Sequence, residues 1–540
     1  MPKIVINEYD NTTAGVGNYQ NFSVLVPGFV GKSVVEEGVF DANGVFECSD
    51  AEEFENKIGK KVTRWKVEPV SPIVTRMSFN PETQTEVTDP ETEAEVTDQD
   101  TQTEVDDFKA KKAAKTLYDI YGGKEFEEAG YLHTTTEEFK LTEDPLPIKG
   151  KEYAFIEKGK EGVDGKTESH YGNQIAYELL KLGYTVLFKK IDAVSDLTKA
   201  GCWTELKDKA SYDFRYVLTG IIDDSENASE ANKKIIELAN YVNADYAGIE
   251  GEGKDLNSTG RGDCIALCDI SEHIYKNENV TTQSQAIAAI QAEVSEMPAS
   301  KYAAIFAPSV DYSMPVDKVY KNTTFPASFH YLACAARARE NYNEWYAVAG
   351  YTRGISKYSV NGLGFKFGEA AIDALEPRYS KTIKSGTETK TFDKAVNLIV
   401  KMKNDIVLWG NRTAEKLDAY SETAECGLRA SHFLNIRQLC CTLKKQIYVA
   451  CRKFTFDPNS DVLWINFCNA IRPTLERMKA DQGITDYKFI KRRSSKKALL
   501  CAKIRIVPIE AVEDFDISLT LEDSISGIKT GIDIDEKEAE

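Results

Sequence analysis

The sequence contains few histidines and lacks the common motifs of catalytic and metal-binding sites. Its five histidines include no pair at the spacing of a His-Glu-x-x-His site, and no G-x-x-x-x-G-K-[ST] phosphate-binding loop is present. Cys264 and Cys268 lie four residues apart in an expected strand, and we do not expect them to hold a zinc ion. The glycine-rich turn at 248–254 carries acids that would repel a phosphate. We therefore predict no catalytic residue, no cofactor, no metal and no enzymatic activity.

Long hydrophobic runs are also missing, and so is a cysteine framework. No apolar stretch approaches the roughly 20 residues that a membrane span needs. The 11 cysteines form no Cys-x-x-Cys pair, which favours a reducing compartment with buried thiols. The first residues do not have the layout of a signal peptide. We expect a chain of several domains that is assembled in a cytoplasm and does not insert into a membrane.

Acids outnumber bases in this chain as a whole, but the balance is reversed in one block. The formal net charge is −19, yet residues 429–505 carry 17 Lys or Arg against 5 Asp or Glu. A basic block in an acidic protein requires either an anionic neighbour or a solvated face. The densest part of the block contains five cations in seven positions and is our candidate contact with a partner or another subunit: Lys491, Arg492, Arg493, Lys496 and Lys497.

The basic block has a clear expected structure. Apolar periodicity predicts helices at 434–451 and 461–479, separated by Pro458 and an N-cap at Asn459 or Ser460. Gly483 is expected to end the second helix in a left-handed conformation. A run rich in β-branched residues at 498–507 predicts a strand. The block thus forms an α+β domain with two long helices and a small sheet.

Strand and helix patterns alternate from about 151 to 381. Helices are expected at 172–183, 228–243, 283–297 and 327–339, and strands at 184–191, 214–220, 247–250, 263–269 and 302–308. This alternation predicts an α/β middle domain with a mostly parallel sheet covered on both faces. We expect residues 382–390 to be a linker and 391–521 to be the basic C-terminal domain.

The two ends of the chain are harder to assign. Residues 1–20 read as a strand on a flexible leash, and residues 21–150 as a β-rich region. Within that region, 81–107 repeats a Thr-x-x-Glu-Val unit and holds 11 acids without a Lys or Arg, which indicates an exposed acidic insert. Residues 522–540 form an acidic tail. The purposes of the repeat and of the tail are not readable from the sequence.

The order of short motifs in the last third of the chain resembles one known family. It runs from Trp409-Gly-Asn-Arg-Thr413 through Leu434-Asn-Ile-Arg437 and Phe456-Asp-Pro-Asn459 to the helix that ends at Gly483. This order is similar to that of the C-terminal domain of contractile tail sheath proteins of bacteriophages and related injection machines. The strand ending at Glu8 and the run Phe22–Gly31 also look like the entry pattern of that family.

The resemblance implies a structural subunit without enzymatic function. It implies hexameric rings stacked in a helix around a tail tube, with baseplate and tail terminator proteins as further partners. The rings would lie in a virion tail, assembled in the host cell cytoplasm, and would contract to drive the tube through a cell envelope for genome ejection. Direct binding to nucleic acid is not implied.

The resemblance also assigns roles to strands. An N-terminal strand would be donated to a neighbouring subunit, through Lys3, Ile4, Val5, Ile6, Asn7 and Glu8. A C-terminal strand would be the second donor, through Phe515, Ile517, Leu519 and Leu521. The sheet that receives them would include Leu500, Ala502, Ile504 and Ile506.

Two other classes of function remain open at this point. The alternating middle region is compatible with a cytoplasmic α/β enzyme, which a pocket with shifted titrating groups would support. The basic domain is compatible with a nucleic-acid binder, which steeply salt-dependent DNA binding would support. The sequence does not separate a phage sheath from that of another injection machine.

Overall fold

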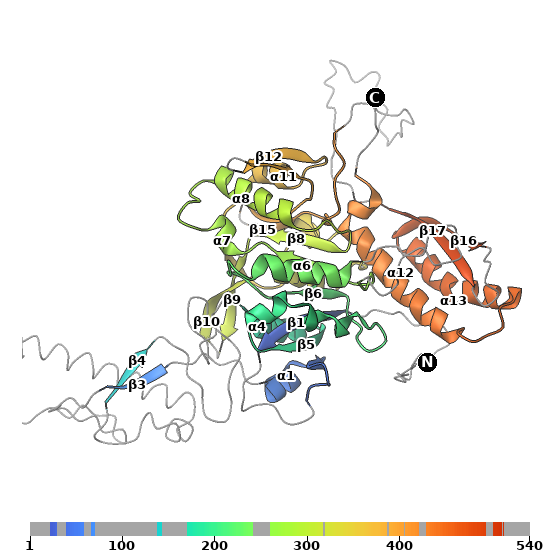
Figure 1. Ribbon diagram of the computed structural model, residues 1–540, viewed down its shortest axis with the longest axis horizontal. Coiled ribbons are helices and arrows are strands. Elements are labelled where there is room, and N and C mark those ends of the chain that lie inside the picture. The colour runs from blue at the N-terminus through green and yellow to red at the C-terminus, as the bar shows by residue number, and fades with distance from the viewer. Residues whose placement is uncertain are drawn as a thin grey trace, which may run out of the picture.

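The structure is a computed structural model of the 540-residue chain (Figure 1). It describes residues 22–29, 39–58, 66–70, 138–142, 170–240, 260–316, 319–385, 388–403, 405–420, 428–492, 500–509 and 511. Both donor strands expected at the ends of the chain, the acidic repeat, the acidic tail, the expected strand at 247–250 and residues 493–499 lie outside these ranges.

An eight-stranded sheet forms the centre of the molecule. Its order is β15 (Asp405–Trp409), β14 (Asn397–Met402), β8 (Ala303–Ala307), β7 (Ile265–Asp269), β6 (Tyr216–Leu218), β1 (Ser23–Phe29), β5 (Thr185–Ile191) and β2 (Val45–Cys48). The six strands from β14 to β5 run parallel, and the two edge strands are antiparallel to their neighbours. The expected mostly parallel sheet is therefore confirmed.

Helices follow the strands in the order that the alternating pattern predicts. They are α1 (Ala51–Ile58), α4 (Gly172–Lys181), α5 (Ala200–Trp203), α6 (Ala228–Ala239), α7 (Glu272–Tyr275), α8 (Gln283–Glu296), α9 (Ala327–Ala338), α10 (Gly350–Arg353) and α11 (Glu369–Leu375). Every residue of β1, β7 and β8 is buried, so both faces of the sheet are covered. Continuous apolar strands suit this position because neither of their faces meets water.

The linker expected at 382–390 falls largely on strand residues. Among them, the described residues 382–385 and 388–390 belong to the antiparallel pair of β12 (Lys381–Ser385) and β13 (Glu388–Phe392). The next two strands, β14 and β15, then belong to the main sheet. The polar composition of 382–390 identifies a surface turn, but only the strand that β14 pairs with decides to which body the following residues belong.

The structure describes two further small antiparallel sheets. One contains β9 (Val310–Val316), β10 (Val319–Phe325) and β11 (Val360–Leu363). The other pairs β3 (Lys66–Val70) with β4 (Glu138–Thr142). No helix among the described residues is both long and apolar enough to span a lipid bilayer.

A second body follows and has its own small hydrophobic core. It consists of α12 (Leu434–Lys453), α13 (Asp461–Ala480), β16 (Ile484–Arg492) and β17 (Cys501–Pro508), which project to one side of the main sheet (Figure 1). Both predicted long helices are confirmed to within two residues. The Ser460 side chain accepts a hydrogen bond from the Leu463 amide at 3.3 Å, so Ser460 is the N-cap of α13.

The C-terminus of α13 corrects one expectation. The left-handed residue is Gln482, with φ of 59°, and not Gly483. The Gly483 amide donates to the Met478 carbonyl at 2.7 Å, which closes a Schellman motif one residue earlier than expected. Gly483 is required for space instead, because a Cβ there would lie 2.8 Å from Leu439 Cδ1 and 3.0 Å from the Trp345 ring.

A buried histidine ties α4 to the carboxyl end of β6. His170 Nε2 donates to the Thr219 carbonyl at 2.7 Å, and Nδ1 accepts from the Gly172 amide at 3.3 Å. Only the neutral ring can do both, because a protonated Nδ1 cannot accept. Burial lowers the pKa of His170 to about 4.

This histidine predicts a specific loss of stability in acid. The unfolded chain takes up a proton near pH 6.5 while the folded chain does not until about pH 4, so stability falls as the pH drops through this window. Between about pH 7 and about pH 5 we expect a loss of about 2 kcal/mol from this group. Urea unfolding followed by tryptophan fluorescence should show a smaller acid loss in His170→Asn than in the wild type. The half-buried His273→Asn should retain the full loss, and equal losses in all three chains would contradict the assignment.

Candidate assembly interface

The sheet of the second body has one face on helix α13 and one face in solvent. Strands β16 and β17 form an antiparallel hairpin in which Tyr487 pairs with Ile506 and Phe489 with Ile504. These side chains are partly buried against the core that contains Phe467, Leu475 and other residues of α13. An isolated two-stranded hairpin is marginal in water, so its packing on α13 is what holds it.

The residues expected to receive the donated strands lie on β17 or directly before it. Ile504 and Ile506 are on the helix-facing side, Ala502 is exposed further along β17, and Leu500 is half-buried just before the strand. The sheet contains only two strands among the described residues, which leaves main-chain groups at both of its edges without a described neighbouring strand. Such edges are templates on which an extended segment can add.

The basic cluster at 491–497 is described only at its beginning. The Lys491 ammonium lies 2.7 Å from the Asp461 carboxylate at the start of α13, and both side chains are exposed. Arg492 is the last residue of β16. The positions of Arg493, Lys496 and Lys497 fall outside the described residues. The role of the cluster as a contact surface therefore stays a prediction.

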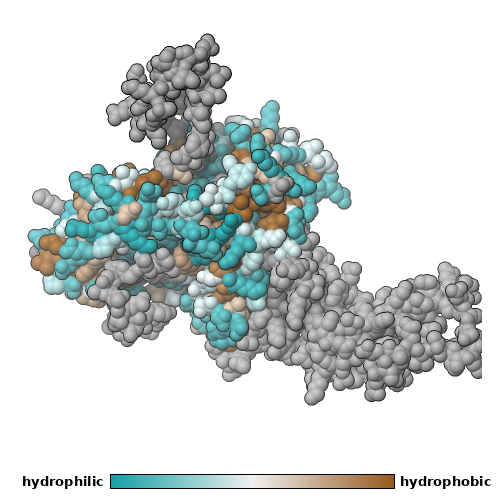
Figure 2. All heavy atoms as spheres, turned by 180° about the vertical axis from the view of Figure 1, so that it is seen from behind, coloured by the Kyte–Doolittle hydropathy of each residue, from teal (hydrophilic) through white to brown (hydrophobic). Residues whose placement is uncertain are grey.

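Hydrophobic side chains gather at the free end of the α12–α13 hairpin. Figure 2 shows a mostly hydrophilic surface with separate hydrophobic patches. The exposed hydrophobic side chains of this end are Tyr448, Val449, Phe456, Val462 and Ile465. Phe456 is 82% exposed and has a φ of 77°, a conformation that bulky residues rarely adopt. These side chains leave the end of the hairpin more hydrophobic than a typical protein surface.

The motif Trp409–Thr413 connects the last strand of the main sheet to α12. A Cβ at Gly410 would lie 2.8 Å from the Asn397 Cα, so the close approach of β14 requires glycine there. The buried Arg412 lies 3.2 Å from a Glu376 carboxylate oxygen and over the Phe433 ring at 4.8 Å. The motif is therefore a structural joint between the two bodies.

Helix α12 docks on the main sheet through polar side chains that are buried. Arg215 is fully buried, forms an ion pair with Glu344, and donates to the Thr442 hydroxyl at 2.6 Å. Lys445 pairs with Asp213 and donates to the Phe214 carbonyl at 2.8 Å. Apolar periodicity alone does not reveal these contacts. The sequence offered one signal for these contacts, which is the polar side of the predicted helix formed by Arg437, Gln438 and Lys445. A helix side exposed to solvent would show the same pattern.

A second group of contacts extends this docking along α12. Gln438 donates to the hydroxyls of Tyr216 and Tyr331. Lys444 donates to the Gly262 carbonyl at 3.0 Å and to the Tyr302 hydroxyl at 2.5 Å. Together these contacts join α12 to residues next to β6, β7 and β8, so the two bodies are held in one orientation.

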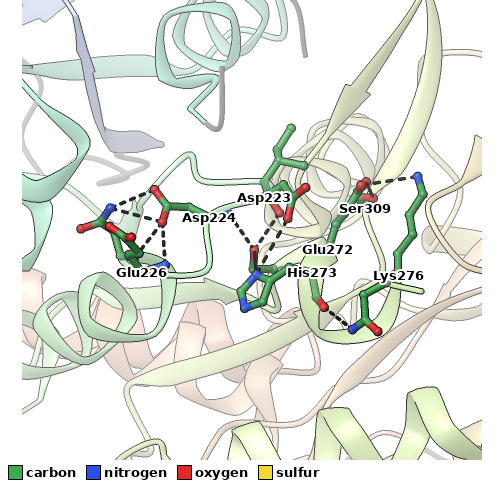
Figure 3. Close-up of polar contacts among 11 residues, drawn as sticks. Asp223, Asp224, Glu226, Glu272, His273, Lys276 and Ser309 are labelled. Atoms are coloured by element: carbon green, nitrogen blue, oxygen red, sulfur yellow. Dashed lines mark hydrogen bonds and ion pairs between the residues drawn. The ribbon is translucent and has the colours of Figure 1, made fainter. Parts of the chain in front are cut away.

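The carboxyl ends of β6 and β7 carry a polar cluster, the place where an α/β enzyme would bind its ligand (Figure 3). Asp224 accepts from the amides of Glu226 and Asn227 and shapes the turn before α6. Glu272 accepts from the Ser309 hydroxyl and pairs with Lys276 at 3.4 Å. His273 contacts the Ser271 hydroxyl at 2.8 Å. These groups are engaged in shaping the loops that follow the strands.

Cys264 and Cys441 are among the described thiols that are fully buried. Burial raises the pKa of Cys264 to about 12 and that of Cys441 to about 11, which keeps both thiols protonated. Within the part of the chain that the structure describes, no three His, Cys, Asp or Glu side chains are placed to hold a metal ion.

Comparison with known proteins gives structural matches only. No protein-family model matches the sequence, and no curated protein sequence matches it. The chain is similar to a protein in the anti-feeding prophage baseplate, with 13% identity, a TM-score of 0.44, and coverage of 65% of this chain and 80% of that one. It is similar to the contracted sheath complex of an extracellular contractile injection system, with 15% identity, a TM-score of 0.43, and coverage of 66% and 80%. It is also similar to the sheath tail protein of Desulfitobacterium hafniense, with 10% identity, a TM-score of 0.34, and coverage of 94% of this chain and 100% of that one. The latter two are sheath structures.

The buried ion pair between Arg215 and Glu344 predicts a strong dependence on its acidic partner. Glu344→Ala would leave the fully buried guanidinium without its counter-charge, and we expect the free energy of unfolding to fall by about 3–5 kcal/mol. Glu340→Ala is the matched control, because its pair with Lys357 is exposed and contributes less than about 1 kcal/mol. Urea unfolding measures both, and equal losses would show that the docking of α12 does not depend on this pair.

Proposed function

We propose that this chain is the subunit of a contractile tail sheath. Copies of it polymerise as stacked hexameric rings around a tail tube and contract to drive the tube through a cell envelope. The observation that carries the proposal is the ordered set of motifs between Trp409 and Gly483, which in the structure forms a joint, a docked helix and a helix that carries a small sheet. The resemblance of this order to sheath proteins is specific because it involves several motifs in sequence.

Strand exchange between subunits supplies the connection that such a machine requires. Subunits must slide past each other and stay linked, and main-chain hydrogen bonds to an added strand survive while rigid bodies repack. The open edges of the β16–β17 hairpin are suited to receive such strands. In this proposal the donors are residues 3–8 of one neighbour and 515–521 of another.

Each of the two bodies has its own role in such a sheath. The first body, built on the eight-stranded sheet, is the rigid unit to which the second body is attached. The second body carries the exchanged strands, and its basic cluster contacts the tube or the next subunit. The exposed end of the α12–α13 hairpin, with Phe456 held outward, is covered in the assembly. Energy is stored in the difference between two sets of subunit contacts, so no nucleotide is needed.

The partners follow from the same proposal. The tube protein fills the ring, a baseplate gives the signal to contract, and a terminator protein closes the far end. The sheath belongs to a virion tail or to a related injection machine and is assembled in the host cell cytoplasm.

Electron microscopy of the purified chain at rising concentration tests the strand donor. We expect rings or tubes with a regular repeat, and we expect them to vanish when residues 2–12 are deleted, because the donated strand is lost. Deletion of the acidic insert 81–107 is the control and should leave the polymers in place. Polymers that survive the first deletion would refute strand donation by the N-terminus, and polymers lost in both deletions would show only general damage.

Charge reversal tests the basic cluster. Changing Lys491, Arg492 and Arg493 to Glu should weaken co-sedimentation with the tube protein by at least about tenfold at low salt, because three attractive contacts become repulsive. Reversal of the exposed Lys207, Lys384 and Lys401 on the first body is the matched control. Unchanged co-sedimentation of the first variant would remove this role.

A further inference from the structure

The outer face of the β16–β17 hairpin carries uncompensated positive charge. Lys488 lies directly opposite Arg505 across the hairpin, and Lys503 lies opposite Ile490. Lys488, Lys503 and Arg505 are all exposed, and none of them forms an ion pair with another described residue. Like charges directly opposite each other destabilise a strand pair. This face, defined by Lys488, Lys503 and Arg505, is named the outer basic face.

The neighbouring cations of the second body are different. Lys479 lies 3.1 Å from Asp486, and Lys491 lies 2.7 Å from Asp461. Local acids thus neutralise the cations at the end of α13 and on the helix-facing side of β16. Asp486 lies on the same side of β16 as Lys488 but is paired with Lys479, so no described acid of the hairpin pairs with Lys488, Lys503 or Arg505.

The acidic tail 522–540 has the matching charge. It contains seven Asp or Glu and two Lys in 19 residues. Asp533 and Asp535 are two positions apart, as are Lys503 and Arg505 on β17. Residues at this spacing in an extended chain point to the same side about 7 Å apart, so two acids can meet two cations in register.

The chain also leaves the hairpin in the right place. β17 ends at Pro508, and the Ile509 amide donates to the Gly483 carbonyl at 3.2 Å, which fixes the exit point beside the start of β16. The 11 residue-to-residue steps from Ala511 to Glu522 can span up to about 36–40 Å. The eight residues of β17 extend about 27 Å, so the tail can reach every part of the outer basic face of its own hairpin.

We propose that, in the free subunit, the acidic tail 522–540 binds the outer basic face of its own β16–β17 hairpin. The same copy is the source because a tether of this length gives an effective concentration near millimolar, far above that of other copies in a dilute solution. The bound tail neutralises Lys488, Lys503 and Arg505 and shields them from other anionic surfaces. Assembly partners that need this face must displace the tail. The inference does not depend on the sheath proposal.

A synthetic peptide with the sequence of residues 522–540 tests this self-contact in the full-length chain. One variant replaces the seven tail acids by their amides, from Glu522→Gln to Glu540→Gln, which frees the face without shortening the chain. At low salt and below the onset of polymerisation, fluorescence anisotropy should show the labelled peptide binding this variant at least about tenfold more tightly than the wild type, whose own tail occupies the face. Binding should weaken by at least about tenfold at high salt, because exposed ion pairs are screened.

Two further variants in the amide-tail background locate the contact. Lys488→Glu with Lys503→Glu and Arg505→Glu should abolish peptide binding. Lys207→Glu with Lys384→Glu and Lys401→Glu, exposed cations on the first body, should preserve it. Equal peptide binding by the outer-face reversal and by this control would overturn the proposal.

Two further outcomes would also contradict the proposed contact between the tail and the outer basic face. No peptide binding by the amide-tail variant would overturn the proposal and leave the acidic insert 81–107 or another chain as the counter-charge. Peptide binding by the wild type as tight as by the variant would overturn the same-copy contact. The donor strand 515–521 is intact in every chain used, so polymers seen by electron microscopy report on the sheath proposal separately.

Discussion

The structure depends on the buried polar contact between α12 and the main sheet. Arg215, Glu344 and Thr442 meet where water is excluded, and Lys445 meets Asp213 beside them. Such groups are costly to bury unless every charge has a partner, so they favour one orientation of α12 over near alternatives. The second body inherits this orientation because α12 is its first element. A surface carried by α13 or by the β16–β17 hairpin is thereby fixed relative to the eight-stranded sheet.

The second body is small, and its sheet is incomplete among the described residues. Its core consists mainly of α12 and α13 side chains together with Trp345, and the hairpin adds only a partly buried layer. Both hairpin edges and the outer basic face are therefore available to other segments. A module that is firmly attached on one side and unfinished on the other is suited to assembly, since added strands or tails complete it without disturbing the attachment.

Much of this architecture follows from local sequence. The alternation of helices and strands predicted the parallel sheet, because a helical crossover returns the chain to a parallel strand. The continuous apolar runs of the strands agree with this, because such strands are buried on both faces. The two long helices were predicted to within two residues, because Pro458 and the Ser460 cap act on the chain directly around them. The predicted reason for a glycine at position 483 was wrong. The left-handed position is Gln482, and glycine at 483 is required by the neighbouring Trp345 ring, which the local sequence does not reveal.

The sequence by itself determined which segments form helices and strands, where the charge lies, and which family the motifs resemble. Only the tertiary structure decided that β14 and β15 join the main sheet and that the polar side of α12 is buried. It also decided that Lys491 pairs with Asp461, while Lys488 and Arg505 have no such partner among the described residues. The physical reason is the distance along the chain over which each kind of interaction acts. Turns, caps and periodicity act within a few residues, whereas strand partners, burial of a charge and its neutralisation depend on surfaces that come from distant parts of the chain.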